Sequence, residues 1–229
     1  MHPSILLIFG LLTFSAFSQE VVVQTELITL ALDEAVEDLY FSDGSAISPF
    51  TANITGLSQP VRYSGPQKMV LRASAAEFTA KPPLPSPAAT VMLPLNADRV
   101  LLCCLKSGDS PLKIVAYNIT SADSRAGDYR FFNFSSKPLS VNLGEKSFAL
   151  LPKLDKIVTD NSWRQDVLDL PMQVASVESQ KPRLVYSSMW GHRPGRRNFI
   201  FMFDGRHPSK PVTICRFFDI PATAKPASP

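Results

Sequence analysis

One short stretch near the C-terminus concentrates the side chains that can bind a ligand. Its members are an aromatic ring, an imidazole and three guanidinium groups: Trp190, His192, Arg193, Arg196 and Arg197. Guanidinium groups bind carboxylate or sulfate through paired hydrogen bonds, and an indole offers a flat face to a sugar ring, a partner or a cation. We therefore expect an anion-binding or glycan-binding loop here. The alternative is a solvated basic loop in which Trp190 packs on an arginine of the protein itself.

Two apolar runs flank this stretch, Leu184–Trp190 and Phe199–Phe203. Turn-forming residues separate them, namely Gly191, Pro194 and Gly195. Apolar runs around a Gly- and Pro-containing loop predict a long-looped β-hairpin. In the second run phenylalanines alternate with Ile200 and Met202, which is typical of a strand buried on both faces. The sequence thus predicts a hairpin that carries the basic and aromatic residues at its tip.

No catalytic signature accompanies the loop. The chain contains no Gly-x-Ser-x-Gly elbow, His-Glu-x-x-His pair, Walker loop or Gly-x-Gly-x-x-Gly turn. Only His192 and His207 follow the leading segment, and Cys215 is not followed by the His and Met of a copper site. We expect a non-enzymatic protein without metal or cofactor. A hydrolase is a distant alternative for which no residue can be named.

The chain has three cysteines, Cys103, Cys104 and Cys215. Adjacent strand residues point to opposite faces, so only one of the first two can reach the third. One disulfide, with Cys104 and Cys215 as the candidate pair, would fit an exported protein. The separation of roughly 110 residues favours the alternative, in which all three are small buried hydrophobic residues.

The N-terminus has the pattern of a signal peptide. An apolar run of 13 residues, Ile5–Phe17, precedes small residues at Ala16 and Ser18, which predicts cleavage before Gln19. The run is shorter than the about 20 residues of a transmembrane helix. We expect a secreted or periplasmic protein with no integral membrane segment after cleavage. Because no Lys or Arg precedes the run, a retained membrane anchor is the alternative.

The net charge of +3 is unevenly distributed. Residues 19–50 contain seven acids and no Lys or Arg, whereas residues 181–216 contain eight bases and one acid. The two ends either compensate each other as solvated surfaces or provide an anion-facing surface on the C-terminal part. Nucleic acid is not expected as a partner, because no recognition motif is present.

Short β-type runs separated by turn residues predict an all-β sandwich fold. The 20 prolines are scattered between the runs. The longest gap between expected strands is 153–170, with a short helix expected within 159–170. The Pro- and Ala-rich tail 221–229 is expected to be disordered.

Three local matches in the same order indicate an internal repeat. Pro49–Ile54 aligns with Pro138–Leu143, Arg99–Leu102 with Arg183–Tyr186, and Ile114–Asn118 with Ile200–Asp204, at offsets of 89, 84 and 86 residues. We therefore predict a signal peptide at 1–18, two tandem modules at 19–122 and 123–220, and a tail at 221–229. One large sandwich is the alternative.

The segment Phe131–Gly144 resembles the opening strands of immunoglobulin-like modules in secreted bacterial proteins, in which a strand ends in a polar turn and a proline starts its neighbour. The resemblance implies a fold class and carries no functional residues. Asn53, Asn118 and Asn133 each begin a glycosylation sequon, although the position of Asn133 in an expected strand argues against the use of all three. We expect an exported protein that binds an envelope or matrix glycan through residues 190–197. The alternative is an accessory subunit that docks on a secreted partner through a sheet edge.

Overall fold

The computed structural model describes residues 21–106, 108–120, 124–164, 166–178 and 181–221. The predicted signal peptide, the predicted boundary between modules and residues 222–229 of the predicted tail lie outside the described residues. Within them the chain is built of strands with two short 3-10 turns, Ala75–Phe78 and Ser162–Arg164, so the all-β class is confirmed. No described helix is long and apolar enough to cross a membrane.

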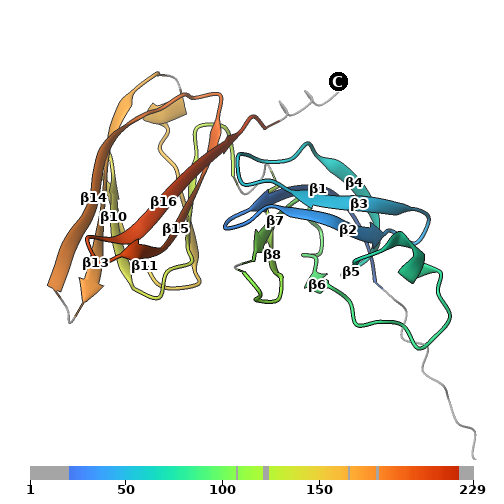
Figure 1. Cartoon of the computed structure of the whole chain (residues 1–229). Coiled ribbons are helices and arrows are strands. Elements are labelled where there is room, and N and C mark those ends of the chain that lie inside the picture. The colour runs from blue at the N-terminus through green and yellow to red at the C-terminus, as the bar shows by residue number, and fades with distance from the viewer. Residues whose placement is uncertain (1–20, 107, 121–123, 165, 179–180, 222–229) are drawn as a thin grey trace, which may run out of the picture.

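The strands form four sheets of four strands each. Those of the N-terminal half are β1 (Val22–Ala31), β2 (Val36–Ser42), β3 (Ile47–Ala52), β4 (Val61–Pro66), β5 (Lys68–Arg72), β6 (Ala89–Met92), β7 (Arg99–Leu105) and β8 (Lys113–Asn118). Those of the C-terminal half are β9 (Tyr129–Asn133), β10 (Leu139–Leu143), β11 (Lys146–Leu150), β12 (Asp155–Val158), β13 (Asp169–Glu178), β14 (Lys181–Gly191), β15 (Arg197–His207) and β16 (Lys210–Asp219). Figure 1 shows the two halves side by side.

Both halves have the same strand order, displaced by eight strands. The N-terminal sheets run β4-β1-β7-β8 and β3-β2-β5-β6, and the C-terminal sheets run β12-β9-β15-β16 and β11-β10-β13-β14. The direction is shared too, because β1 pairs with β7 in parallel as β9 does with β15. We call the sheets that contain β1 and β9 the inner sheets and the other two the outer sheets.

The three sequence matches do not join equivalent strands. Pro49–Ile54 lies on β3 but Pro138–Leu143 forms β10, the counterpart of β2. The other two matches likewise pair β7 with β14 and β8 with β15, each one strand out of step. The residue alignments were therefore wrong, because alternating apolar strands resemble one another and do not reveal their place in a sheet.

Three apolar clusters hold the sheets together. One lies between the inner and outer sheets of the N-terminal half, and a second lies between those of the C-terminal half. The third joins the two inner sheets and contains Leu101, Cys103, Phe132, Phe199 and Phe201. The inner sheets are therefore covered on both faces. This confirms that the strand at Phe199–Phe203 is buried on both sides, since residues 199–202 have no exposed surface.

The cysteines are free thiols. Cys104 points into the N-terminal cluster, whereas Cys103 and Cys215 belong to the cluster between the inner sheets. The proposed Cys104–Cys215 pair is thus not formed, because neighbouring residues of β7 face opposite sides. Burial raises the pKa of the Cys104 thiol to about 12 and that of Cys215 above its usual value. All three behave as small apolar side chains.

The interval 153–170 differs from what the sequence predicted. The gap at 153–170 contains a strand, β12, which pairs with β9, and its expected helix is the 3-10 turn Ser162–Arg164. Of the three sequon residues, Asn133 is only 1% exposed, and its amide donates to the carbonyl oxygens of Lys137 and Leu150. Asn53 is exposed.

Candidate functional site

The stretch from residue 190 to 197 is a crossover between sheets and not a hairpin tip. β14 pairs with β13 in the outer sheet, whereas β15 pairs with β9 and β16 in the inner sheet. The predicted hairpin is therefore wrong. Apolar flanks do not distinguish two strands of one sheet from two strands that face each other across a core.

Trp190 closes the C-terminal core at the end of β14. It is 6% exposed, and its indole nitrogen donates to the Tyr186 hydroxyl at 2.9 Å. Its ring stacks against that of Tyr129, with centroids 6.4 Å apart, and the Arg216 guanidinium lies 4.9 Å from its ring centre. Trp190 therefore packs inside the protein against Arg216, which is the alternative considered for it from the sequence.

His192 is fully buried at the crossover. Its Nε2 faces the carbonyl oxygen of Trp163, which can only accept, so Nε2 carries the proton of the neutral ring. Its Nδ1 then accepts from the Tyr129 hydroxyl at 3.0 Å. Burial lowers the pKa of His192, and the charges of Arg216 and Arg193 lower it further, although the bond to Trp163 opposes the shift. His192 fixes the crossover and offers nothing to a ligand.

Arg197 is also fully buried. Its Nη1 donates to the carbonyl oxygens of Ile119 at 2.6 Å and Ser124 at 3.0 Å, and its Nη2 pairs with Asp219. Asp219 also lies 3.7 Å from Arg99. Arg99 is the first residue of β7, the N-terminal counterpart of β15, which begins at Arg197. Burial lowers the pKa of the Arg197 guanidinium, and the bond to Asp219 opposes that shift. Arg197 therefore joins the halves and is not an exposed cation.

Arg193 and Arg196 are the two predicted residues that reach the surface. A tight turn with Pro194 and Gly195 at its centre brings them together, closed by a 3.1 Å bond from the Arg196 amide to the Arg193 carbonyl. The Arg193 guanidinium donates to the His192 carbonyl at 3.0 Å, and the Arg196 guanidinium lies 4.2 Å from the ring centre of Phe218.

A third arginine, Arg216 on β16, completes the site. Its Nε and Nη2 donate to the Asn198 side-chain oxygen at 3.1 and 2.9 Å, and Nη2 also donates to the Gly191 carbonyl at 2.9 Å. Burial lowers the pKa of Arg216, and the nearby Arg196 adds to that effect. Sequence reasoning counted Arg216 among the basic residues but not in the site, because β16 is brought to the crossover only by tertiary pairing.

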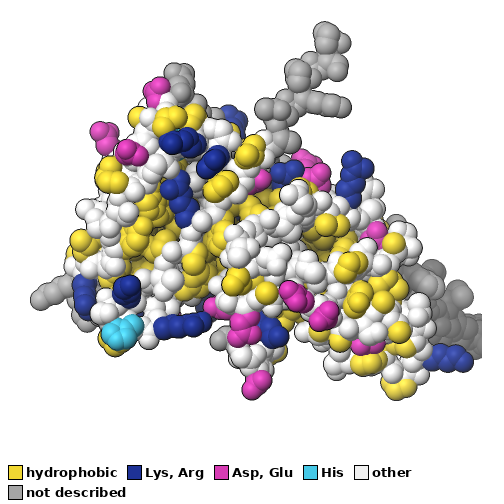
Figure 2. All heavy atoms as spheres, turned by 45° about the horizontal axis from the view of Figure 1, so that its top comes forward, with side chains coloured by type: hydrophobic (Ala, Val, Ile, Leu, Met, Phe, Trp, Pro, Cys, Tyr) yellow, Lys and Arg dark blue, Asp and Glu magenta, His cyan; other side chains and the backbone are white. Residues whose placement is uncertain are grey.

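These residues line a cavity of about 240 Å³ that we call the arginine pocket: Gly191, Arg193, Arg196, Asn198, Arg216 and Phe218. Arg72, Arg99, Arg130 and Arg197 each have a carboxylate partner. In the described part of the chain, none of the three pocket arginines has one. Figure 2 shows Lys and Arg side chains gathered on the C-terminal half beside hydrophobic ones.

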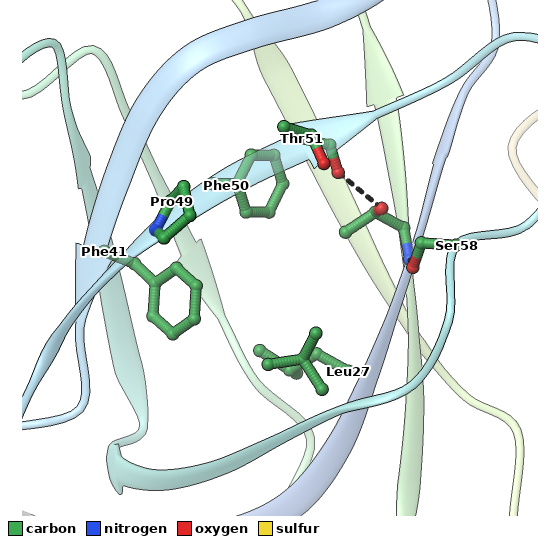
Figure 3. A pocket seen from close by; sticks show the side chains of 8 residues that line it. Leu27, Phe41, Pro49, Phe50, Thr51 and Ser58 are labelled. Atoms are coloured by element: carbon green, nitrogen blue, oxygen red, sulfur yellow. Dashed lines mark hydrogen bonds between the residues drawn. The ribbon is translucent and has the colours of Figure 1, made fainter.

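A second hollow lies in the N-terminal half, where Leu27, Phe41, Pro49 and Phe50 surround it (Figure 3). Its volume is about 60 Å³, which is room for about two water molecules. The Thr29 hydroxyl closes one side by donating to the Thr51 carbonyl at 2.6 Å. The hollow has no charged lining residue, so it offers a ligand only apolar contacts and the polar groups of Thr29, Thr51 and Ser58.

The described residues contain no group of three side chains that could hold a metal ion. The chemistry that the arginine pocket offers is the binding of an anion. No protein-family model and no curated protein matches this chain.

Proposed function

We propose that the protein is an exported, non-enzymatic binding protein built of two immunoglobulin-like β-sandwiches. It holds an acidic group of an envelope or matrix glycan in the arginine pocket. The observation that carries this proposal is the presence around one cavity of three arginines that have no carboxylate partner among the described residues. Cations held close together repel one another, and an anion between them relieves that repulsion.

The size of the pocket suits part of a polymer. At about 240 Å³ it is smaller than the roughly 300–1,000 Å³ of sites for drug-sized molecules. One acidic substituent with part of a sugar ring fits that space, and the rest of the chain would run over the surface. Phe218, which is 52% exposed, provides an apolar contact at the rim.

The two sandwiches are supported by the repeated strand order and by a separate apolar cluster in each half. The signal peptide predicted from the sequence at residues 1–18 supports export. Export would bring the pocket to the compartment in which acidic glycans are found.

The test is binding to heparin, which carries both carboxylate and sulfate groups. We expect the mature protein to bind at low salt and the double variant Arg193→Ala/Arg196→Ala to bind about tenfold or more weakly, because two charge-assisted contacts are lost. Arg183→Ala/Arg206→Ala is the control, since it removes the same charge from exposed positions outside the pocket. Equal losses in both double variants, or no binding by the parent, would refute the proposed function.

A second candidate is an accessory subunit that docks through a sheet edge. β14 is an 11-residue strand at the end of its sheet, with Leu184 and Met189 58% and 60% exposed. Such an edge can pair with a strand of another protein. In that case Leu184→Lys/Met189→Lys would abolish binding of the native partner, whereas the pocket variants would bind it normally.

A further inference from the structure

The hydrogen bonds of Arg216 leave only one end of its guanidinium free. Nε and Nη2 both donate to the Asn198 oxygen, and Nη2 also donates to the Gly191 carbonyl at 2.9 Å and, more weakly, to the Tyr129 hydroxyl at 3.5 Å. Trp190 lies against one face of the group. Nη1 has no partner among the described residues, so its two hydrogens are available to a ligand.

This arrangement disfavours a planar carboxylate. A carboxylate pairs best with two neighbouring nitrogens of one guanidinium, either Nε with Nη2 or Nη1 with Nη2. Both pairs include Nη2, whose hydrogens are already used by Asn198 and Gly191. A carboxylate would therefore meet Arg216 through Nη1 alone and lose half of its preferred contact.

Arg193 and Arg196 are exposed and able to adjust, whereas Arg216 is held in place, so Arg216 sets the preference of the pocket. The cations come from two separate elements, the crossover turn and β16. Single donors from different directions suit an anion whose oxygens also point in different directions. A sulfate or phosphate ester has three such terminal oxygens, and a phosphate monoester also carries up to twice the charge of a carboxylate.

We infer that the arginine pocket recognises a tetrahedral oxyanion, the sulfate or phosphate ester of a glycan, in preference to a carboxylate, and that Asn198 determines this preference by occupying the fork of Arg216. The inference rests on the proposed function, since it names the acidic group that the pocket would hold.

The test compares three polymers that share one backbone: dextran sulfate, dextran phosphate and carboxymethyl dextran, at matched substitution and ionic strength. Affinity electrophoresis gives a dissociation constant for each. We expect the carboxymethyl polymer to bind about tenfold more weakly than at least one of the other two. The stronger of the sulfate and phosphate polymers identifies the ester. Equal binding of all three, with heparin still bound, would overturn the inference and leave the proposed function intact.

Two variants test the role of Asn198. Asn198→Ala frees the Nε–Nη2 fork of Arg216, so the preference for the tetrahedral group should fall to within about threefold, mainly through tighter binding of the carboxylate polymer. Arg216→Lys keeps the charge but removes the Nη1 donor that the bonds to Asn198 and Gly191 hold in place, so it should weaken binding of the tetrahedral polymers. A general loss of structure would weaken all three polymers alike, so the ratio of affinities distinguishes the two effects. An unchanged ratio in folded Asn198→Ala would refute the role of Asn198.

Discussion

At the scale of single residues, the side chains that looked like ligands serve two different purposes. His192, Trp190 and Arg197 are buried and bond to the protein itself, whereas Arg193 and Arg196 remain exposed. The residue types are the same as in a binding loop. Their roles differ because a buried polar group must find its partners inside the protein. Each of the three buried residues has such partners within the C-terminal half or at the junction.

Because His192 is buried, we expect the folded protein to lose stability on acidification. Its pKa in the folded state is lowered from 6.5, so the unfolded chain binds more protons than the folded protein at mildly acidic pH. The stability that comes from burying the neutral His192 ring is fully present above about pH 6.5 and is lost as the pH falls below that value. We expect the urea midpoint to drop between pH 7.5 and pH 5. Asp160, whose pKa is lowered to about 2, stays charged throughout this window.

His192→Gln provides the matched comparison for this prediction. The amide can donate to the Trp163 carbonyl as the ring does, but it does not titrate. Its urea midpoint should therefore depend less on pH over the same range. A variant with the slope of the parent would show that the acid sensitivity comes from another group.

At the scale of elements, the real hairpin of this region is β15–β16. Its strands pair from Arg197–Asp219 to Asp204–Val212, with an irregular register between Asp204 and His207. The pairing brings Arg216 beside Asn198 and so completes the arginine pocket. At the other end of the hairpin, Gly205 lies so close to β16 that a Cβ atom would be 1.6 Å from the Lys210 carbonyl oxygen.

Gly205→Ala should therefore push the strands apart at that end. We expect a loss of about 1–3 kcal/mol in the free energy of unfolding, measured with urea, as for other substitutions that overfill a packed site. Gly195→Ala is the control, because no atom lies within 4 Å of its Cβ position. Its free energy of unfolding should change by less than about 0.5 kcal/mol. Equal stability of the two variants would contradict the close packing at Gly205.

At the scale of the whole molecule, the two halves meet through the faces of their inner sheets. The rings of Phe132 and Phe201 stack within the cluster between those sheets, with centroids 4.7 Å apart and planes 7° from parallel. Asp219 lies between Arg197 of its own half and Arg99 of the other. A large apolar junction with a charged pair at its border favours unfolding of both halves as one unit.

Removal of the Phe132 and Phe201 rings should make the two halves unfold separately. We expect the parent to unfold in one calorimetric transition and Phe132→Ala/Phe201→Ala to unfold in two. Each single substitution should cost about 3–5 kcal/mol, as is typical for Phe→Ala in a core. Phe131→Ala is the matched control, because Phe131 is equally buried but points into the C-terminal cluster. It should destabilise its half and keep a single transition; a split transition in this control would contradict the role of the junction.

The sequence alone determined the all-β class, because alternating apolar runs between turn residues fit strands and no other element. It also located the apolar strands at Leu184–Trp190 and Phe199–Phe203 and the concentration of cations near the C-terminus. It did not determine which strands pair, since a run such as Phe199–Phe203 is equally apolar whether its neighbour is β14 or β16. β12 was missed because Asp155 and Lys156 hide the alternation of so short a strand.

Tertiary structure decided which of the five candidate residues face solvent. The crossover from the outer to the inner sheet turns Trp190, His192 and Arg197 inward. Trp190 bonds to Tyr186, His192 to Tyr129 and Trp163, and Arg197 to Asp219. The same crossover leaves Arg193 and Arg196 outside and brings Arg216 to them from β16. Local sequence sets what a side chain can do. Contacts between distant segments decide whether that side chain faces solvent, the core or a ligand.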